Sequence, residues 1–350
     1  MASGTDMVDR IELSQGAGGS ETEAFIKQHI LPRFQQPDTE VPLQALDDAA
    51  VVDGVVFTTD SHTVQPLFFP GGDIGSLAVA GTVNDVAVMG AQPIGLAAAM
   101  VIEEGLPLDS IERVLDSMAS CSRRADVPIV TGDTKVLEHG ALQDMIVTTA
   151  GIGRSSEVLQ QNLQELGRGT TWLRDSALQP GDAIILSGHI ADHGIALLSF
   201  REGYGFETEI TSDVAPVNGL MQQCIEAGGV VAAKDPTRGG LANTLHEMAS
   251  KSAVGMHILE EHIPIREGTM AACEMLGIDP YTVGNEGKVV LAAAAEKADD
   301  VLQAMRRHPL GKDAAVIGHV TRETRVVLET GVGGTRLLEA PVGDPIPRIC

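Results

Sequence analysis

Aromatic and basic residues are both scarce in this chain. Phe, Trp and Tyr make up 3% of the 350 residues, so the protein cores must be built from Val, Ile, Leu and Ala. Lys and Arg number 24 against 48 Asp and Glu, which gives a formal net charge of −24. A surface this acidic repels a phosphate backbone or an anionic membrane. We therefore expect neither nucleic acid nor a membrane as a partner.

Long apolar runs and paired cysteines are also missing. The longest weakly polar stretch, residues 74–102, contains Asn84, Asp85 and Pro93, which a membrane span rarely tolerates near its middle. The N-terminal residues lack the apolar core of a signal peptide. Four cysteines, at positions 121, 224, 273 and 350, show no CxxC spacing, as is typical of free thiols in a reducing compartment. These features predict a soluble cytoplasmic protein.

The length of the chain suffices for two domains, each with its own core. Strand-like and helix-like patterns are mixed in both halves, which predicts an α+β fold with two domains in tandem. We expect a glycine-rich loop and helix at 1–40 and a mixed β-sheet domain at 41–155. A connector at 156–180, a second domain at 181–325, and a terminal strand with a flexible tail at 326–350 follow.

Local patterns predict individual helices. Ser20 followed by Glu23 is a capping-box pattern, which predicts a helix from Ser20 to Pro32. Apolar periodicity predicts further helices at 73–89, 107–125, 192–202, 213–227, 239–251 and 297–307.

The last ten residues differ in composition from the rest of the chain. Pro341, Pro345 and Pro347 are incompatible with a helix and favour an extended segment. At roughly 3.3 Å per residue, ten extended residues reach about 30 Å from the last strand. Such termini are often inert, but this one is long enough to carry Cys350 into a distant cleft.

Several carboxylates stand in apolar or turn surroundings. Asp85 is the only charged residue between Asp73 and Glu103, and the others follow strand-like segments or turns: Asp47, Asp48, Asp60, Asp133 and Asp235. A buried carboxylate is costly unless it is paired or binds a metal. For any single one, capping a helix or bonding turn amides explains it equally well. As a group, with neighbouring Asn and Thr, they are the oxygen ligands that Mg²⁺ prefers beside phosphate.

Two glycine-rich segments add a second sign of a nucleotide site. Backbone N–H groups at Gly18 and Gly19 precede a predicted helix and can bind phosphate. No Gly-Lys-Ser/Thr follows, so the segment is not a Walker A motif. Thr237 and Arg238 open another predicted helix and add a cation. The predicted ATP site comprises Gly18, Gly19, Asp48, Asp60, Asn84, Asp85, Asp133, Asp235, Thr237 and Arg238. Its predicted Mg²⁺ ligands are Asp48, Asp60, Asp85 and Asp133.

Lys135 and Glu286 are the two further residues with catalytic potential. Lys135 directly follows a Gly-Asp-Thr turn, where its ammonium group can stabilise a developing anion or transfer a proton. Glu286 lies in a Gly-Asn-Glu-Gly-Lys turn before an apolar strand. Each pattern would also suit an ordinary surface residue.

A series of motifs runs through nearly the whole chain: Asp47-Asp-Ala-Ala, Thr58-Thr-Asp-Ser-His-Thr-Val, Phe68-Phe-Pro-Gly-Gly-Asp-Ile-Gly, Asn84-Asp-Val-Ala-Val-Met-Gly-Ala, Thr131-Gly-Asp-Thr-Lys-Val, Ile190-Ala-Asp-His-Gly, Asp235-Pro-Thr-Arg-Gly-Gly, Asn285-Glu-Gly-Lys and Pro347-Arg-Ile-Cys350. Together, and in this order, they resemble the HypE family of hydrogenase maturation proteins. The terminal Pro-Arg-Ile-Cys is the most specific of them.

The resemblance implies a fold and an assembly. The wider superfamily includes aminoimidazole ribonucleotide synthetase, selenophosphate synthetase and thiamine-monophosphate kinase. In it, the N-terminal domain pairs with its copy in a homodimer, and ATP binds in the cleft beside that interface. The second domain is an α/β sandwich.

The resemblance also implies a reaction. In the HypE family a partner carbamoyltransferase places a carbamoyl group on the terminal cysteine. The enzyme then dehydrates this S-carboxamide to an S-cyanate at the expense of Mg-ATP. The cyano group passes through an iron-binding scaffold complex to a nickel–iron hydrogenase. Carried over to this chain, Cys350 holds the substrate, Lys135 is the positioning cation, and Glu286 is the base with Glu274 as the alternative.

Two other functions remain open from the sequence. A superfamily kinase or synthetase that acts on a free small molecule needs the nucleotide site but neither Cys350 nor the proline-rich tail. A carbamoyl carrier without catalysis of its own needs the cysteine but not the nucleotide site.

Overall fold

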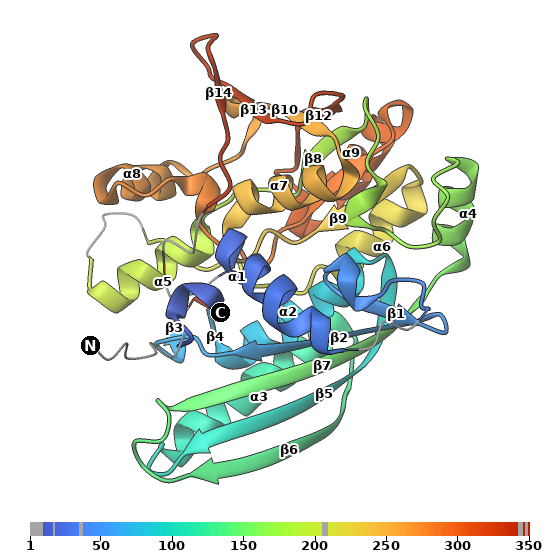
Figure 1. The fold of residues 1–350 in the computed structure, drawn as a ribbon. Coiled ribbons are helices and arrows are strands. Elements are labelled where there is room, and N and C mark those ends of the chain that lie inside the picture. Colours follow the sequence, from blue (N-terminus) through green and yellow to red (C-terminus); the bar gives the residue numbers. More distant parts are fainter. Residues whose placement is uncertain (1–9, 17, 35–37, 205–208, 342–345, 347–348) are drawn as a thin grey trace, which may run out of the picture.

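The chain folds into two domains, each with its own β-sheet. The computed structural model describes residues 10–16, 18–34, 38–204, 209–341, 346 and 349–350. Figure 1 shows the N-terminal sheet in the lower part of the molecule and the second sheet in the upper part. Each sheet is mixed, because one parallel pair of strands joins otherwise antiparallel neighbours. The predicted α+β class with two domains is confirmed.

The N-terminal sheet has five strands. In spatial order they are β1 (Ala50–Val52), β2 (Val55–His62), β7 (Met145–Ser155), β5 (Ala91–Glu103) and β6 (Ile129–Leu137). β5 and β6 are parallel because α3 (Leu108–Ala125) returns the chain to the end of the sheet at which β5 begins. α2 (Ile74–Val88) and α3 pack on one face. A two-stranded hairpin of β3 (Phe68–Phe69) and β4 (Gly72–Asp73) leads into α2.

α2 lies between the two domains. Its first turn is fixed by a capping box, in which Asp73 accepts the N–H groups of Gly75 and Ser76 and the Ser76 hydroxyl accepts the N–H of Asp73. The helix has no polar face, since it packs on the N-terminal sheet on one side and on elements of the second domain on the other. It therefore connects the two cores.

The second sheet has seven strands. In spatial order they are β14 (Thr335–Leu337), β13 (Val326–Glu329), β10 (Gly255–Leu259), β12 (Ala315–Thr321), β8 (Ala183–Leu186), β11 (Val290–Ala293) and β9 (Val230–Lys234). All residues of β8, β9 and β11 are buried, as expected for strands covered on both faces.

Helices cover both faces of this sheet. Ile184 of β8 belongs to the core formed with α7 (Gly240–Ser252). Its neighbour Ile185 belongs to the opposite core, formed with α6 (Asn218–Ala227) and α9 (Ala298–Arg307). The remaining helices are α1 (Gly19–Phe25), α4 (Glu157–Glu165), α5 (Asp192–Glu202) and α8 (Glu267–Leu276). In the described part of the chain, no helix is both long and apolar enough to cross a membrane.

Two of the helix predictions need correction. Ser20 does not cap α1, which instead begins after Gly18, and the chain continues through one π-helical and one 3₁₀ turn to Arg33. The Gly18 N–H is bonded to the hydroxyl of Thr22 at 2.8 Å. The helix predicted at 213–227 begins only at Asn218, because the backbone before it bonds elsewhere: the N–H of Ala215 donates to the carbonyl of Glu286, and the N–H of Val217 donates to the side chain of Asn84.

The tail that we predicted to be flexible is seated in this structure. Ile346 and Ile349 are each 1% exposed and belong to the same apolar cluster as Val283 and Ile195. This cluster also contains residues of α2 and α3, so the described end of the tail packs where the two domains meet. The physical reason is apolar burial, which offsets the freedom that an extended terminus loses.

Candidate functional site

α2 brings one charged side chain to the junction of the domains. Of its 15 residues, Asp85 alone is not fully buried. One carboxylate oxygen of Asp85 accepts a hydrogen bond from the hydroxyl of Thr58 at 2.9 Å. Burial raises the pKa of Asp85 well above its usual range, and the charges of Asp60, Asp235 and Asp48 raise it further. Four carboxylates from both domains therefore act on one another at this point.

Asp48 is held by a cation from the second domain. Its carboxylate is paired with the ammonium group of Lys234, which ends β9 and is 6% exposed. Lys234 also lies 3.3 Å from Asp175 and 3.3 Å from Glu247. Burial raises the pKa of Asp48 well above its usual range, while the charge of Lys234 opposes this rise. The pair fixes the loop before β1 against the second domain.

The ion-pair network extends beyond Lys234. Lys251 on α7 lies 2.7 Å from Asp175 and 3.5 Å from Asp47, and Arg174 lies 3.1 Å from Asp47. Asp47 therefore belongs to this network: it pairs with Arg174 and shares Lys251 with Asp175, whereas its sequence neighbour Asp48 pairs with Lys234.

Two more carboxyl groups come from loops of the second domain. Asp235 follows β9 and Glu286 lies in the turn before β11; they are 5% and 3% exposed. Desolvation raises the pKa of Asp235 to about 6, although Lys234 lowers it. Burial also raises the pKa of Glu286 well above its usual range, and Asp235 is the largest charge that adds to this rise. Both groups therefore hold protons more tightly than solvated carboxylates.

The two glycine-rich segments meet at Arg238. A Cβ on Gly18 would lie 2.8 Å from the Cβ of Arg238, so Gly18 packs directly against this residue. Gly18 and Gly19 have φ angles of 84° and 71°, a region that favours glycine. Thr237 contacts the loop before β11, because a Cβ on Gly284 would lie 3.0 Å from the Thr237 carbonyl oxygen.

The C-terminus of the chain reaches the same place. The carbonyl oxygen of Cys350 accepts the N–H of Thr63, after β2, at 3.3 Å, and the carbonyl of Ile349 lies 2.9 Å from Nε2 of His193 in α5. The charge of Cys350 is the largest influence on Arg238 and raises its pKa; burial opposes this. Cys350 therefore interacts electrostatically with the same guanidinium as Asp60, Glu286 and Asp85 of the acid cluster.

Asp133 and Lys135 do not reach this site within the chain. Both lie on β6, the edge strand, each with its side chain 67% exposed. Strand register pairs Asp60 with Thr149, Thr149 with Ala98, and Ala98 with Gly132. Three strand spacings correspond to roughly 14 Å. Within one chain, the prediction that Asp133 shares a metal with Asp60 is therefore wrong, and Lys135 is not the cation next to Cys350.

Two other predicted roles also need correction. Asn84 is 1% exposed, and its amide N–H groups donate to the carbonyls of Ala215 and Glu286 while its oxygen accepts the N–H of Val217. Both N–H donors are used within the protein, so Asn84 holds the second domain against α2 instead of binding a nucleotide. Glu274 is exposed on α8 and, unlike Glu286, is not part of the acid cluster.

The most useful residue that sequence reasoning missed is Lys234. Its signal was present, since it is the single charge at the end of the apolar run Val230–Ala233 and directly precedes Asp235. The contact of His193 with the tail depends on tertiary structure and has no local signal in the sequence. Thr63 gave no signal of its own.

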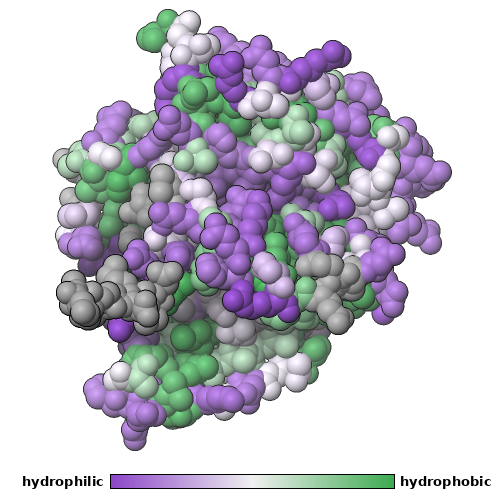
Figure 2. Space-filling model, in the orientation of Figure 1, coloured by the Kyte–Doolittle hydropathy of each residue, from purple (hydrophilic) through white to green (hydrophobic). Residues whose placement is uncertain are grey.

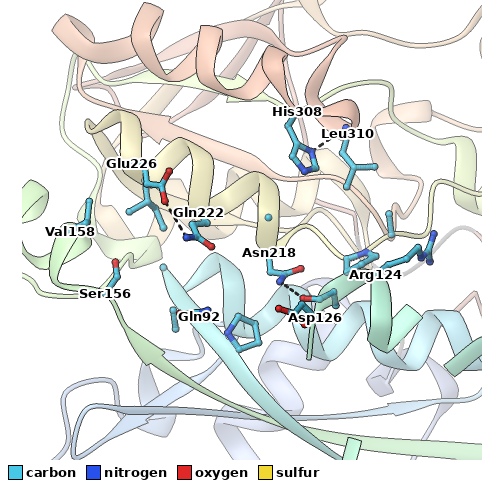
Figure 3. A pocket seen from close by; sticks show the side chains of 18 residues that line it. Gln92, Arg124, Asp126, Ser156, Val158, Asn218, Gln222, Glu226, His308 and Leu310 are labelled. Atoms are coloured by element: carbon cyan, nitrogen blue, oxygen red, sulfur yellow. Dashed lines mark hydrogen bonds between the residues drawn. The ribbon is translucent and has the colours of Figure 1, made fainter. Parts of the chain in front are cut away.

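A separate cavity of about 510 Å³ lies between the two domains (Figure 3). It is lined by polar side chains of α6, the start of β5 and the loop at His308, among them Gln92, Asn218 and Gln222. None of the predicted site residues lines it, so we place the candidate site at the acid cluster and not here.

The acid cluster is not a preformed metal centre. Among the residues that the structure describes, no three His, Cys, Asp or Glu side chains converge as metal ligands. The cluster has instead an excess of negative charge, which the raised pKa values of Asp48, Asp85 and Asp235 express. Such a donor set is suited in charge and atom type to a hard divalent cation.

Comparison of the chain with known proteins identifies the family to which it is similar. Residues 46–155 match the family model described as AIR synthase related protein, N-terminal domain, and residues 179–331 match that of the corresponding C-terminal domain. Carbamoyl dehydratase HypE of Rhizobium leguminosarum bv. viciae is 47% identical over 348 residues, which is 97% of this chain and 95% of that protein.

Solved structures give the same result. A HypE–HypF complex matches with a TM-score of 0.84 and 42% identity over 91% of this chain and 100% of that one. The hydrogenase maturation protein HypE in complex with ATP matches with a TM-score of 0.79 and 41% identity over 97% of this chain and 99% of that one.

The raised pKa of Asp235 predicts how stability changes with pH. A carboxyl group with a raised pKa binds its proton more tightly in the folded state, so its contribution is complete below the unfolded pKa of 3.8 and is lost as the pH rises through about 6. This difference corresponds to about 3 kcal/mol. In metal-free buffer with EDTA, Asp235→Asn should remove this part of the decline in the free energy of unfolding between pH 4 and pH 8, while the raised pKa values of Asp48, Asp85 and Glu286 account for the rest.

Asp133→Asn is the matched control, because Asp133 is exposed on β6 and should leave the pH profile unchanged. If the free energy of unfolding in urea had the same pH dependence in Asp235→Asn as in the wild type, the raised pKa of Asp235 would be contradicted.

Proposed function

This chain belongs to the HypE family of carbamoyl dehydratases, which serve hydrogenase maturation, and we propose that it dehydrates a carboxamide carried on its own Cys350. The observation that supports this most is the position of the tail, whose last residue lies beside Arg238 in a cluster of carboxylates from both domains. A kinase that acts on a free small molecule does not need a tail that ends at the site, and a passive carrier does not need the acid cluster.

We propose that ATP is the co-substrate and binds between the glycine segment and the acid cluster. The HypE structure solved with ATP supports this by homology. In this chain, Gly18 packs against Arg238, the residue that also interacts electrostatically with Cys350, while the Gly18 N–H itself is bonded to the hydroxyl of Thr22. Arg238 and Thr237 are then the phosphate contacts from the second domain.

Mg²⁺ belongs to this proposal because the donor set fits it. Asp48, Asp60, Asp85 and Asp235 are oxygen donors whose mutual repulsion a divalent cation relieves. When bound, the ion would screen the phosphate charge against the incoming oxygen. Asp133 of the same chain is too far away to be a ligand beside Asp60.

The reaction needs a better leaving group than hydroxide. We propose that the carboxamide oxygen on Cys350 attacks the γ-phosphorus of ATP, with loss of ADP and of one N–H proton. The carbon–oxygen bond then breaks, phosphate departs with that oxygen, and loss of the second N–H proton leaves the S-cyanate. Burial of the tail keeps water from the activated intermediate.

Glu286 and Arg238 are the residues placed to assist these steps. Glu286 is nearly fully buried, and its raised pKa makes its carboxylate a stronger base than a solvated one. Arg238 interacts electrostatically with both Cys350 and Glu286 and is suited to stabilise the oxygen anion. Within one chain, Arg238 takes the role that the sequence assigned to Lys135.

We propose that the protein acts as a homodimer through the N-terminal sheet. The face opposite α2 and α3 carries exposed Phe57 and Ile152, which lie directly opposite each other on β2 and β7. Val130 and Val136 on the edge strand are 65% and 64% exposed. Figure 2 shows apolar residues gathered over the lower part of the molecule, where this sheet lies. A second copy covers this face and brings its own β6 with it.

The other partners follow from the chemistry. We propose that a carbamoyltransferase related to HypF loads Cys350, since a HypE–HypF complex is among the solved relatives. The S-cyanate passes to an iron-binding scaffold complex. The reducing cytoplasm suits both steps, because it keeps the thiol of Cys350 available.

Intact-mass measurement tests the dehydration. Full-length protein carbamoylated on Cys350 should lose the mass of one water when Mg-ATP is added. Glu286→Gln should slow this loss by about 100-fold or more, because the amide cannot accept the proton. Glu274→Gln is the control, since Glu274 is exposed, and should react at the wild-type rate. An unchanged mass in the wild type would contradict the proposed dehydration. A Glu286→Gln variant that loses water at the wild-type rate would contradict the role of Glu286 as the base.

Light scattering tests the dimer. Wild-type protein at low micromolar concentration should have twice the mass of one chain, and Ile152→Lys should have the mass of one chain because it places a charge in the apolar face. Leu337→Lys is the control, because Leu337 is exposed on β14 of the other domain. A dimeric Ile152→Lys variant would show that the interface lies elsewhere.

A further inference from the structure

The peptide group before Cys350 is held by one buried side chain. His193 has no exposed surface, and its Nε2 lies 2.9 Å from the carbonyl oxygen of Ile349. Its Nδ1 lies 2.8 Å from the hydroxyl of Ser212. No step of the proposed reaction uses His193, although it contacts the residue directly before the reacting cysteine.

The partners of His193 fix its tautomer. The hydroxyl oxygen of Ser212 already accepts the N–H of Val214 at 3.1 Å, so its own hydrogen is available to Nδ1. Nε2 then carries the proton and donates to the Ile349 carbonyl, which can only accept. Burial lowers the pKa of His193, which favours this neutral form.

Hydrogen bonds fix the segment around His193, against which the tail packs. Ala191 has a φ of 71°, and its N–H donates to the side chain of Asn285 at 2.7 Å. Asp192 accepts the hydroxyl of Thr269 at 2.6 Å and Nε of Arg266 at 2.8 Å. These bonds hold the backbone in a conformation that a non-glycine residue rarely adopts.

Gly194 leaves room for the tail next to this segment. A Cβ at Gly194 would lie 2.5 Å from Cγ1 of Val283 and 3.2 Å from Cδ1 of Ile346. A Cβ at Gly284 would lie 2.6 Å from Cδ1 of Ile349. The two glycines thus allow the two buried isoleucines of the tail to approach the backbone on both sides.

His193 also contacts the N-terminal domain. The ring of Phe69 on β3 meets its imidazole edge to face, with centroids 5.6 Å apart. The N–H of Ser212 donates to the carbonyl of Pro70 at 2.8 Å. The group that holds the tail is therefore itself set by the packing of one domain on the other.

We infer that His193 is a positioning residue that sets the register of the tail and so presents the Cys350 carboxamide to Arg238 and Glu286. Apolar contacts of Ile346 and Ile349 favour burial but are not directional. A slip of one residue along an extended chain moves the thiol by roughly 3.3 Å, more than a reacting group tolerates. The Ile349 hydrogen bond opposes that slip. This inference rests on the proposed dehydration of the tail.

The test uses full-length protein and two readouts. The first is the single-turnover loss of water from carbamoylated Cys350 after addition of Mg-ATP. The second is the rate at which iodoacetamide alkylates Cys350 in the unloaded protein, followed on the C-terminal peptide. The other three cysteines are buried and do not interfere.

His193→Phe keeps an aromatic ring but removes the donor. It should slow the water loss by about 100-fold and speed the alkylation of Cys350 by about tenfold, since one hydrogen bond no longer holds the tail. His193→Gln retains an N–H donor and should recover most of both rates. Ser212→Ala keeps the imidazole but removes the hydroxyl that orients it. Both of its rates, for water loss and for alkylation, should lie between those of the wild type and those of His193→Phe.

His189→Phe is the matched control, in the loop directly before α5. His189 pairs with Asp313 at 3.4 Å instead of the tail, so both rates should remain at wild-type values. Wild-type rates in His193→Phe, or a His193→Gln variant as slow as His193→Phe, would overturn the inference while leaving the dehydratase function intact. If His193→Phe fails to fold, Ser212→Ala decides: wild-type rates there overturn the inference. A wild-type protein that loses no water would overturn the proposed function instead. The alkylation rates would still test whether His193 holds the tail in place.

Discussion

The pairing of Lys234 with Asp48 is the interaction on which the site depends. Without a buried cation, the loop before β1 would bring a further negative charge to a place that already holds Asp85 and Asp235. Lys234 offsets part of this repulsion and ties the loop to the end of β9. The same ammonium group contacts Asp175 of the connector and Glu247 of α7. The domains are thereby joined where their acids meet, and the remaining excess of negative charge is left for a cation to neutralise.

The tail uses the same junction. Its carbonyl groups bond to Thr63 of one domain and His193 of the other, so the position of Cys350 depends on both. A carbamoyltransferase must reach this cysteine, whereas dehydration must exclude water from it. A chain terminus can satisfy both needs, because it can open locally while the rest of the protein stays folded.

Much of the site could be read from the sequence because charge in an apolar context is a local signal. Asp85, Asp235 and Glu286 stand out in this way, and the structure brings them together. Asp133 shows the same local signal, but strand order places it three strands from Asp60, and strand order is not a local property. Lys234 was overlooked because a lysine that ends a strand usually reaches solvent.

The fold was predictable to a similar extent. Sequence patterns located α2 and α3 closely, whereas Ala215 and Val217, predicted as helix, instead supply backbone groups to Glu286 and Asn84. The prolines of the tail favour an extended chain, but Pro345 and Pro347 lie outside the described residues, and the prolines give no sign of where the end of the tail rests. That place is formed by segments around positions 63, 193 and 284, which only the tertiary fold brings together.

The central claim is that the amide oxygen on Cys350 leaves as part of phosphate. Protein carbamoylated with an ¹⁸O-labelled carboxamide can be treated with unlabelled Mg-ATP in unlabelled water, and the released phosphate analysed by mass spectrometry. The account predicts one ¹⁸O atom in the inorganic phosphate for each S-cyanate formed. Unlabelled phosphate, with ¹⁸O found in the solvent or retained on the protein, would contradict it.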